Sequence, residues 1–170
     1  MILILTGPPA AGKTTIGPLL AKQLERCAVV DVDQVRAMVV QPHIAPWRGE
    51  AGMAQLRLGA HNACTLARNF VANGYAVVIL DVLTDETAQL YRTALAAHQP
   101  TIVLLLPSLA EVLHRNQTRG QWLTDDEVEL LYTWQENLQI YDRKIDNSHI
   151  PVDALVLELI EQTTKIQPLV

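Results

Sequence analysis

The chain of 170 residues, with a mass of 18.8 kDa, is long enough for one domain with a full core and too short for two. Its 49% hydrophobic and 18% charged residues exclude a disordered or low-complexity protein, and its net charge of −5 argues against a coat for nucleic acid or anionic membranes. The longest apolar runs, such as residues 76–80, are far too short to cross a bilayer, and the N-terminal residues lack the charged region of a signal peptide, so we expect a cytoplasmic protein.

Short β-type runs alternate along the chain with longer segments of helical character. These runs are continuously apolar, as in strands that are buried on both faces of a parallel sheet, with helices crossing between them. We therefore predict a three-layer α/β/α fold with a five-stranded parallel sheet, formed by the whole chain, residues 1–170, as a single domain. The expected strands are Ile2–Leu5, Ala28–Val32, Tyr75–Leu80, Ile102–Leu106 and Lys144–Asp146.

Helix boundaries are marked by recognisable residues. The segments Ser108–Glu111 and Thr124–Glu127 have the S/T-x-x-E spacing of a capping box, which starts a helix. Gly74 follows the long segment Gly52–Asn73, where a glycine commonly ends a helix. Pro18 falls beyond the first turn of the helix expected to begin near residue 12, and its missing N–H predicts a kink or break there.

A phosphate-binding motif directly follows the first expected strand. Residues 7–14 fit G-x-x-x-x-G-K-[ST] at every fixed position and have the required strand before them and helix after them. In this motif the backbone N–H groups bind phosphate, the lysine bridges the β- and γ-phosphates, and the threonine hydroxyl binds Mg²⁺. The expected nucleotide contacts are Gly7, Pro8, Pro9, Ala10, Ala11, Gly12, Lys13, Thr14 and Thr15.

The order of motifs narrows the class of nucleotide-binding protein. Neither N-K-x-D nor D-x-x-G stands where a GTPase needs it, and the chain is short for a motor ATPase. It resembles the small phosphate-loop kinases of the nucleoside monophosphate kinase type, especially the AAA-family enzymes that include chloramphenicol phosphotransferase-like, shikimate kinase-like and gluconate kinase-like proteins. The resemblance covers essentially the whole chain and rests on residues 7–15, 31–36, 77–82, 115, 119 and 145–156. It implies ATP and Mg²⁺ as cofactors and a helical lid over about residues 115–126.

Asp33 is the expected catalytic residue. It lies just past the second strand, and the carboxyl ends of parallel strands open onto the ligand crevice. The resemblance implies an aspartate there that orients and deprotonates the acceptor hydroxyl, and Asp31 could share the site or assist the metal. The alternative is that Asp33 only caps the helix expected at Gln34–Val40.

Asp81 ends the third apolar strand. An aspartate at this position holds Mg²⁺ through water in many phosphate-loop proteins, whereas some small kinases use it to bind substrate. A carboxylate that only caps a turn is the third possibility.

Arg115 and Arg119 lie one turn apart on an expected helix, so they share a face where like charges repel unless an anion lies between them. The resemblance implies a lid that closes over the phosphates, with both arginines catalytic and Arg115 contacting the nucleotide. An ordinary solvated helix face is the alternative.

Residues that would bind the molecule that accepts the phosphate have the weakest support from the sequence. The irregular segment Gln41–Gly52 and its neighbours supply several hydrogen-bond donors, each of which taken singly is more often a surface residue. These candidates are Arg36, His43, Arg48, Arg57 and His61, with Asp33 and Asp81 as carboxylate partners. Trp47 is a candidate pocket wall, and Trp122, Tyr132 and Trp134 are either packing residues or ligand contacts. The resemblance places Asn147 near the adenine base.

The favoured function is an ATP- and Mg²⁺-dependent kinase for a hydroxyl of a small molecule. A polynucleotide 5′-hydroxyl kinase is an alternative, since Asp33 and Arg36 have the spacing of that group, although the acidic charge makes nucleic acid an unfavoured partner. A protein that senses ATP without transferring phosphate is the other alternative. No membrane association is expected, and the oligomeric state stays open.

Overall fold

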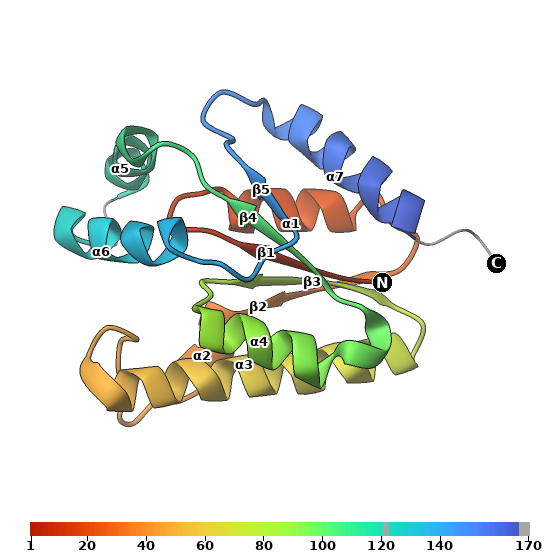
Figure 1. Cartoon of the computed structure of the whole chain (residues 1–170), viewed down its shortest axis with the longest axis horizontal. Coiled ribbons are helices and arrows are strands. Elements are labelled where there is room, and N and C mark those ends of the chain that lie inside the picture. Colours follow the sequence, from red (N-terminus) through yellow and green to blue (C-terminus); the bar gives the residue numbers. More distant parts are fainter. Residues whose placement is uncertain (121–122, 167–170) are drawn as a thin grey trace.

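The computed structural model describes residues 1–120 and 123–166, and Trp122 therefore lies outside the described residues. Five parallel strands form one sheet in the order β2-β3-β1-β4-β5, so the strand that precedes the phosphate-binding motif is central (Figure 1). The strands are β1 Ile2–Thr6, β2 Cys27–Asp31, β3 Ala76–Asp81, β4 Thr101–Leu105 and β5 Arg143–Ile145. The predicted fold class is confirmed, with every strand within two residues of its expected bounds.

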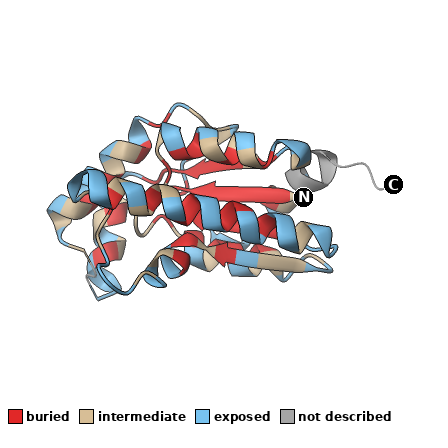
Figure 2. Ribbon diagram, turned by 90° about the horizontal axis from the view of Figure 1, so that it is seen from below, coloured by how far each residue is buried: buried red, intermediate tan, exposed pale blue. Residues whose placement is uncertain are grey.

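Alternation along β1 explains the two helical layers. Ile2 and Ile4 belong to one core cluster with residues of α3 and α4, and Leu3 and Leu5 belong to the other cluster with residues of α1 and α7. Figure 1 shows α1 and α7 on one face of the sheet and α3 and α4 on the other, and Figure 2 shows buried residues on the sheet and the inward helix faces. The helices are α1 Lys13–Ala21, α2 Val32–Ala37, α3 Gly49–Ala72, α4 Asp85–Ala94, α5 Leu109–Thr118, α6 Asp125–Glu136 and α7 Val152–Ile166, with a 3-10 turn η1 at Ala96–His98.

Several boundaries differ from the sequence expectations. Of the kink or break predicted at Pro18, the break is wrong, because α1 runs through that residue to Ala21. The helix expected at Gln34–Val40 both begins and ends earlier, and α3 begins at Gly49, so the irregular segment expected at Gln41–Gly52 lies instead at residues 38–48. Gly74 ends α3 with φ of 79°, as predicted. No helix in the described part of the chain is both long and apolar enough to span a membrane.

The two predicted capping boxes differ in outcome. Thr124 and Glu127 bond reciprocally at the start of α6, as expected. Ser108 accepts a hydrogen bond from the Glu111 amide, but the Glu111 carboxylate accepts from Arg115 instead of returning to the cap. The Ser108 amide donates instead to the Ser148 hydroxyl at 2.8 Å, and the Glu111 carboxylate takes the charge-assisted donor Arg115, so neither partner is left for the second bond of the box.

A buried polar network joins α6 to the sheet. The Thr6 hydroxyl donates to Gln135 Oε1 at 2.7 Å, and Gln135 Nε2 donates to the Leu83 carbonyl at 2.6 Å. The Leu83 amide donates to the Thr6 hydroxyl at 3.1 Å, which closes the network. All three side chains have no exposed surface, so the network holds α6 against the carboxyl ends of β1 and β3.

Candidate active site

The phosphate-binding motif forms a tight loop between β1 and α1. Gly7 is required because a Cβ there would lie 2.2 Å from the Leu105 carbonyl oxygen. Gly12 is the N-cap of α1, has φ of 100° in the left-handed region, and provides no side-chain cap. The N-terminus of α1 is therefore uncapped where the loop meets a cavity, which is a ready anion-binding arrangement.

Lys13 lies folded against its own loop. Its Nζ donates to the carbonyl oxygens of Gly7 at 2.5 Å and Pro8 at 2.9 Å. Burial lowers the pKa of Lys13 to about 8, although the carboxylates of Asp33 and Asp81 favour the charged form. An ammonium group held in this way is prepared to exchange carbonyl partners for phosphate oxygens, which would compensate its desolvation more fully.

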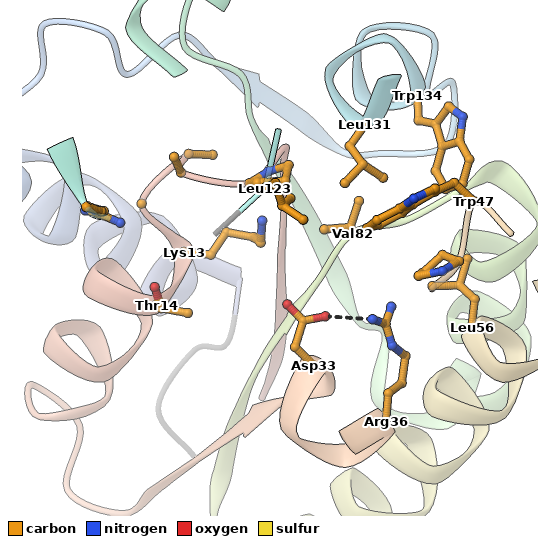
Figure 3. A pocket seen from close by; sticks show the side chains of 16 residues that line it. Lys13, Thr14, Asp33, Arg36, Trp47, Leu56, Val82, Leu123, Leu131 and Trp134 are labelled. Carbon is orange, nitrogen blue, oxygen red and sulfur yellow. Dashed lines mark ion pairs between the residues drawn. The ribbon is translucent and has the colours of Figure 1, made fainter. Parts of the chain in front are cut away.

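A cavity of about 360 Å³ opens beside the loop at the carboxyl end of the sheet (Figure 3). Residues of the phosphate-binding motif meet the predicted catalytic residues Lys13, Asp33 and Arg119 there. Its lining is formed by Pro9, Ala10, Ala11, Gly12, Lys13, Thr14, Asp33, Arg36, Pro46, Trp47, Leu56, Val82, Arg119, Leu123, Leu131 and Trp134. Thr14 is exposed on the loop side, and Asp33 and Arg36 lie between the loop and the far wall.

Asp33 is free of the capping role that the sequence left open. That alternative is wrong, because Asp31 is the N-cap of α2 and its carboxylate accepts from the Asp33 amide at 3.0 Å. The Asp33 side chain is 67% exposed and pairs with Arg36 at 3.4 Å. Arg36 itself is packed against α3, where the missing Cβ of Gly59 makes room for its Cγ. The pair therefore presents an accessible carboxylate steadied by an anchored guanidinium.

Asp81 lies beneath the cavity instead of lining it. Its carboxylate accepts from the Val82 amide and from the Tyr91 hydroxyl, each at 2.8 Å, and is 3% exposed. Burial raises the pKa of Asp81 to about 7, with the two hydrogen bonds acting in the opposite direction. Burial therefore favours the protonated form of the Asp81 carboxyl.

Stability should depend on pH through Asp81. The folded protein holds this carboxyl with a pKa of about 7 against an ordinary value of 3.8, so the stability that protonation contributes is fully present below pH 3.8 and is lost as pH rises through 7. Asp81→Asn keeps an uncharged group that donates to the Tyr91 oxygen. We expect the variant to exceed the wild type in free energy of unfolding by ~2 kcal/mol at pH 8 and by nothing at pH 4.

Urea unfolding at pH 4, 6 and 8 in EDTA, without nucleotide, measures this difference. Glu25→Gln, which removes an exposed carboxylate from the loop between α1 and β2, is the control and should show no such trend. An Asp81→Asn variant that is less stable than the wild type at pH 8 would show that the ionised carboxylate is stabilising.

The two predicted lid arginines have different surroundings. Arg115 pairs with Glu111 at 2.7 Å and donates to the carbonyl of Asn147 at 3.2 Å, and it does not line the cavity. Arg119 lines the cavity and donates to the Thr15 hydroxyl at 3.5 Å. Arg119 thus lies beside the phosphate loop, whereas Arg115 holds the segment that follows β5. Lid closure stays a prediction.

Asn147 contacts the phosphate loop directly. Its Nδ2 donates to the Ala11 carbonyl at 2.9 Å, and the residue is 4% exposed. Its Oδ1 is buried without a hydrogen-bond partner. The structure therefore places Asn147 under the loop, where it supports the backbone.

The remaining predicted acceptor contacts lie outside the cavity lining. Arg57 pairs with Glu50 and, at 3.5 Å, with Glu86, so its charge is already neutralised. The other three are exposed residues of the α2–α3 segment and α3, namely His43, Arg48 and His61. Of the predicted donors for the acceptor, the structure brings Arg36 to the cavity.

Much of the cavity wall was missed by the sequence analysis. Trp47 lines the cavity as predicted, Trp134 joins it from α6, and Tyr132 packs against the core. The apolar residues between them carried no motif, because isolated leucines, valines and prolines look the same in a core and in a pocket. They are Pro46, Leu56, Val82, Leu123 and Leu131.

Comparison with known proteins agrees with this geometry. A family model described as AAA domain matches residues 2–132. The chain belongs to the AAA domain family. No curated protein sequence matches this AAA domain protein.

Solved structures show the same fold. The AAA domain protein is similar to shikimate kinase from Acinetobacter baumannii in complex with shikimate, with 16% identity, TM-score 0.66, and coverage of 98% of this chain and 94% of that chain. A gluconokinase from Sinorhizobium meliloti 1021 matches with 15% identity, TM-score 0.68, and coverage of 97% and 92%. The Deinococcus radiodurans tunicamycin resistance protein matches with 16% identity, TM-score 0.68, and coverage of 95% of both chains. The fold is that of the phosphate-loop small kinases, as the motifs predicted.

Proposed function

We propose that this protein is a kinase that transfers the γ-phosphate of ATP to a hydroxyl of a small molecule, with Mg²⁺ as cofactor. The observation that carries the proposal is that one cavity is lined both by the phosphate loop with Lys13 and by the accessible carboxylate of Asp33. Similarity in fold to a shikimate kinase and a gluconokinase supports a small-molecule acceptor over a nucleic acid.

Each side of the cavity has its own task in this reaction. The N-terminus of α1, Lys13 and Arg119 bind phosphate oxygens and neutralise their charge. Asp33 orients the acceptor hydroxyl and accepts its proton. The acceptor oxygen forms a new bond to the γ-phosphorus, the bond from that phosphorus to the β–γ bridging oxygen breaks, and ADP leaves with the electron pair.

The residues near the loop suit Mg²⁺. Thr14 lines the cavity, and both carboxylate oxygens of the buried Asp81 accept hydrogen bonds, which fits contact of Asp81 with the ion through water. Mg²⁺ commonly takes only one or two protein ligands and completes its octahedron with water and phosphate oxygens. Thr14 and Asp81 would hold the ion, which when bound supplies positive charge against the phosphate oxygens.

Asp33→Asn tests the proposal. The amide still accepts a hydrogen bond from the acceptor but cannot take its proton, so acceptor-dependent turnover should fall by at least ~100-fold. Nucleotide affinity should change much less than turnover, because the Asp33 carboxylate pairs with Arg36, whereas Lys13 Nζ donates to the carbonyls of Gly7 and Pro8 (Figure 3). ADP release from Mg-ATP, measured with a panel of hydroxylated metabolites, reports turnover, and binding of a fluorescent ATP analogue reports affinity.

Asp31→Asn is the matched control, since Asp31 lies two residues away and accepts the cap bond outside the cavity. It should retain turnover to within a few-fold. Tight ATP binding with no ADP release above background for any acceptor would favour a nucleotide sensor. Wild-type turnover in Asp33→Asn would remove Asp33 from catalysis.

A further inference from the structure

The side of the cavity opposite the phosphate loop is apolar and aromatic. Figure 3 shows Trp47, Trp134, Leu131 and Val82 gathered there, away from Lys13 and Thr14. They come from the segment before α3, from α6 and from the residue after β3, so three parts of the chain converge on one surface. A surface built in this way binds a ligand by apolar contact and by stacking rather than by ion pairing.

This wall is partly buried and partly open to the cavity. Leu56 and Leu131, which are 1% and 4% exposed, are buried core residues that also border the cavity. Trp47 and Trp134 are half-buried, with part of each side chain exposed. The exposed parts of the two tryptophans leave apolar surface at the cavity, and a ligand of matching character gains free energy by covering it.

The charges around the cavity argue against an anionic acceptor body. Lys13 and Arg119 lie on the side of the phosphate loop, where the nucleotide would occupy them. Arg36 is already paired with Asp33, and Arg57 is outside the lining and held by two glutamates. Among the described lining residues, a carboxylate at the apolar wall would therefore meet no cation except Arg36. Using Arg36 would take it from Asp33 and bring two carboxylates together.

We propose that the acceptor is an uncharged alcohol with a flat apolar body, which lies against Trp47 and Trp134 and directs its hydroxyl to Asp33. This inference rests on the proposed kinase function and names the substrate class of the same site. The cavity, at about 360 Å³, is near the lower end of the usual range for ligand pockets, and its phosphate-loop side would be taken by phosphate, so the acceptor should be no larger than one ring. Polyhydroxylated acids and sugar phosphates are the excluded classes.

Four small molecules separate the effect of an aromatic ring on binding from the effect of a negative charge. The neutral aromatic probe is 1-phenyl-1,2-ethanediol, mandelate replaces its CH₂OH by a carboxylate, glycerol lacks the ring, and gluconate lacks the ring and carries the charge. Dissociation constants are measured by ligand-observed NMR with the full chain, Mg²⁺ and a non-hydrolysable ATP analogue. We expect the diol to bind at least tenfold more tightly than each of the other three. Equal or tighter binding of mandelate, glycerol or gluconate, or no binding of the diol, would overturn the inference.

Variants locate the binding. Trp47→Ala and Trp134→Ala should each weaken diol binding at least fivefold, whereas Leu157→Ala, which truncates an apolar side chain that is 60% exposed on α7, should leave it unchanged. Unchanged affinity in both tryptophan variants would place the diol elsewhere and overturn the inference. Circular dichroism checks folding of each variant.

A second variant does not depend on truncation. Trp134→Arg adds a cation to the half-exposed edge of the wall and should move the preference from the diol toward mandelate by at least tenfold. An unaltered preference in a folded Trp134→Arg protein would contradict the assignment of the wall.

Phosphoryl transfer is measured separately with the same four probes. Tight diol binding without transfer would count against the kinase function while leaving the binding preference intact. Transfer to gluconate in preference to the diol would support the kinase and overturn the acceptor class.

Discussion

Replacing Lys13 by methionine should lower acceptor-dependent turnover by about 1,000-fold, the scale expected when a preorganised donor to developing phosphate charge is removed. Methionine keeps the unbranched stem of the side chain and removes the ammonium group. The folded protein should not become less stable, because burial lowers the pKa of Lys13 to about 8 and so already opposes its charged form at neutral pH. Because the folded protein favours the neutral amine, the charge of Lys13 lowers the free energy of unfolding. This loss is absent above pH 10.5, the ordinary pKa, and is complete once the pH has fallen through 8.

ADP release and thermal unfolding of the same preparations measure the two effects. Lys22→Met is the matched control, since Lys22 is the exposed C-cap residue of the same helix, and it should change neither quantity appreciably. Turnover in Lys13→Met within tenfold of the wild type would show that phosphate transfer does not use this lysine.

Gln135→Leu should lower the free energy of unfolding by about 3 kcal/mol. Leucine nearly fills the same volume, so the loss comes from polarity: the Thr6 hydroxyl loses its acceptor and the Leu83 carbonyl loses its donor, both in a site without water access. A buried polar group left without a partner costs about 1–3 kcal/mol. Because α6 also carries Leu131 and Trp134, its loosening should weaken acceptor binding too.

Urea titration followed by circular dichroism measures this stability. The control is Gln89→Leu, the same substitution at an exposed position of α4, which should change the free energy of unfolding by less than about 0.5 kcal/mol. A loss below 1 kcal/mol in Gln135→Leu would show that Thr6 and Leu83 find other partners when the amide is absent.

The fold was predictable because its signals are local. Buried parallel strands need continuous apolar runs, and the segments around Ile4, Ile79 and Ile102 supply them in order. Boundaries were less predictable. Pro18 lies within α1 although a missing N–H disfavours that, since the helix packs through Ile16 and Leu20 on either side of it.

The residues of the candidate site that belong to motifs of fixed spacing were predictable from the sequence. The phosphate loop has fixed glycines and a lysine at a fixed spacing, and Asp33 follows directly from strand position. The role of Asp31 at the start of α2 depended on one cap bond, which spacing alone could not assign between two aspartates. Arg57 looked like a substrate donor because neither glutamate partner has the i, i+3 or i, i+4 spacing of a helix pair: Glu50 lies 7 residues away on α3, and Glu86 lies on α4.

The apolar wall and Gln135 were beyond sequence reasoning for a different reason. Trp134 and Gln135 are neighbours on α6, yet one lines the cavity and the other is fully buried in a polar network. Which face of a helix a glutamine occupies depends on what packs there, and the partners of this one, Thr6 and Leu83, lie 129 and 52 residues away along the chain.

The hydrogen bond from Asn147 to the Ala11 carbonyl bears on how the protein could be shortened. The family model ends at residue 132, but the loop that begins at Gly7 rests on a side chain beyond that point. β5 and Ile145, which seal the sheet beside β4, also lie beyond it. A fragment cut at the end of the matched region would keep every residue of the phosphate-binding motif and lose the side chain beneath it, so we expect a fragment that retains the native loop to extend past residue 147.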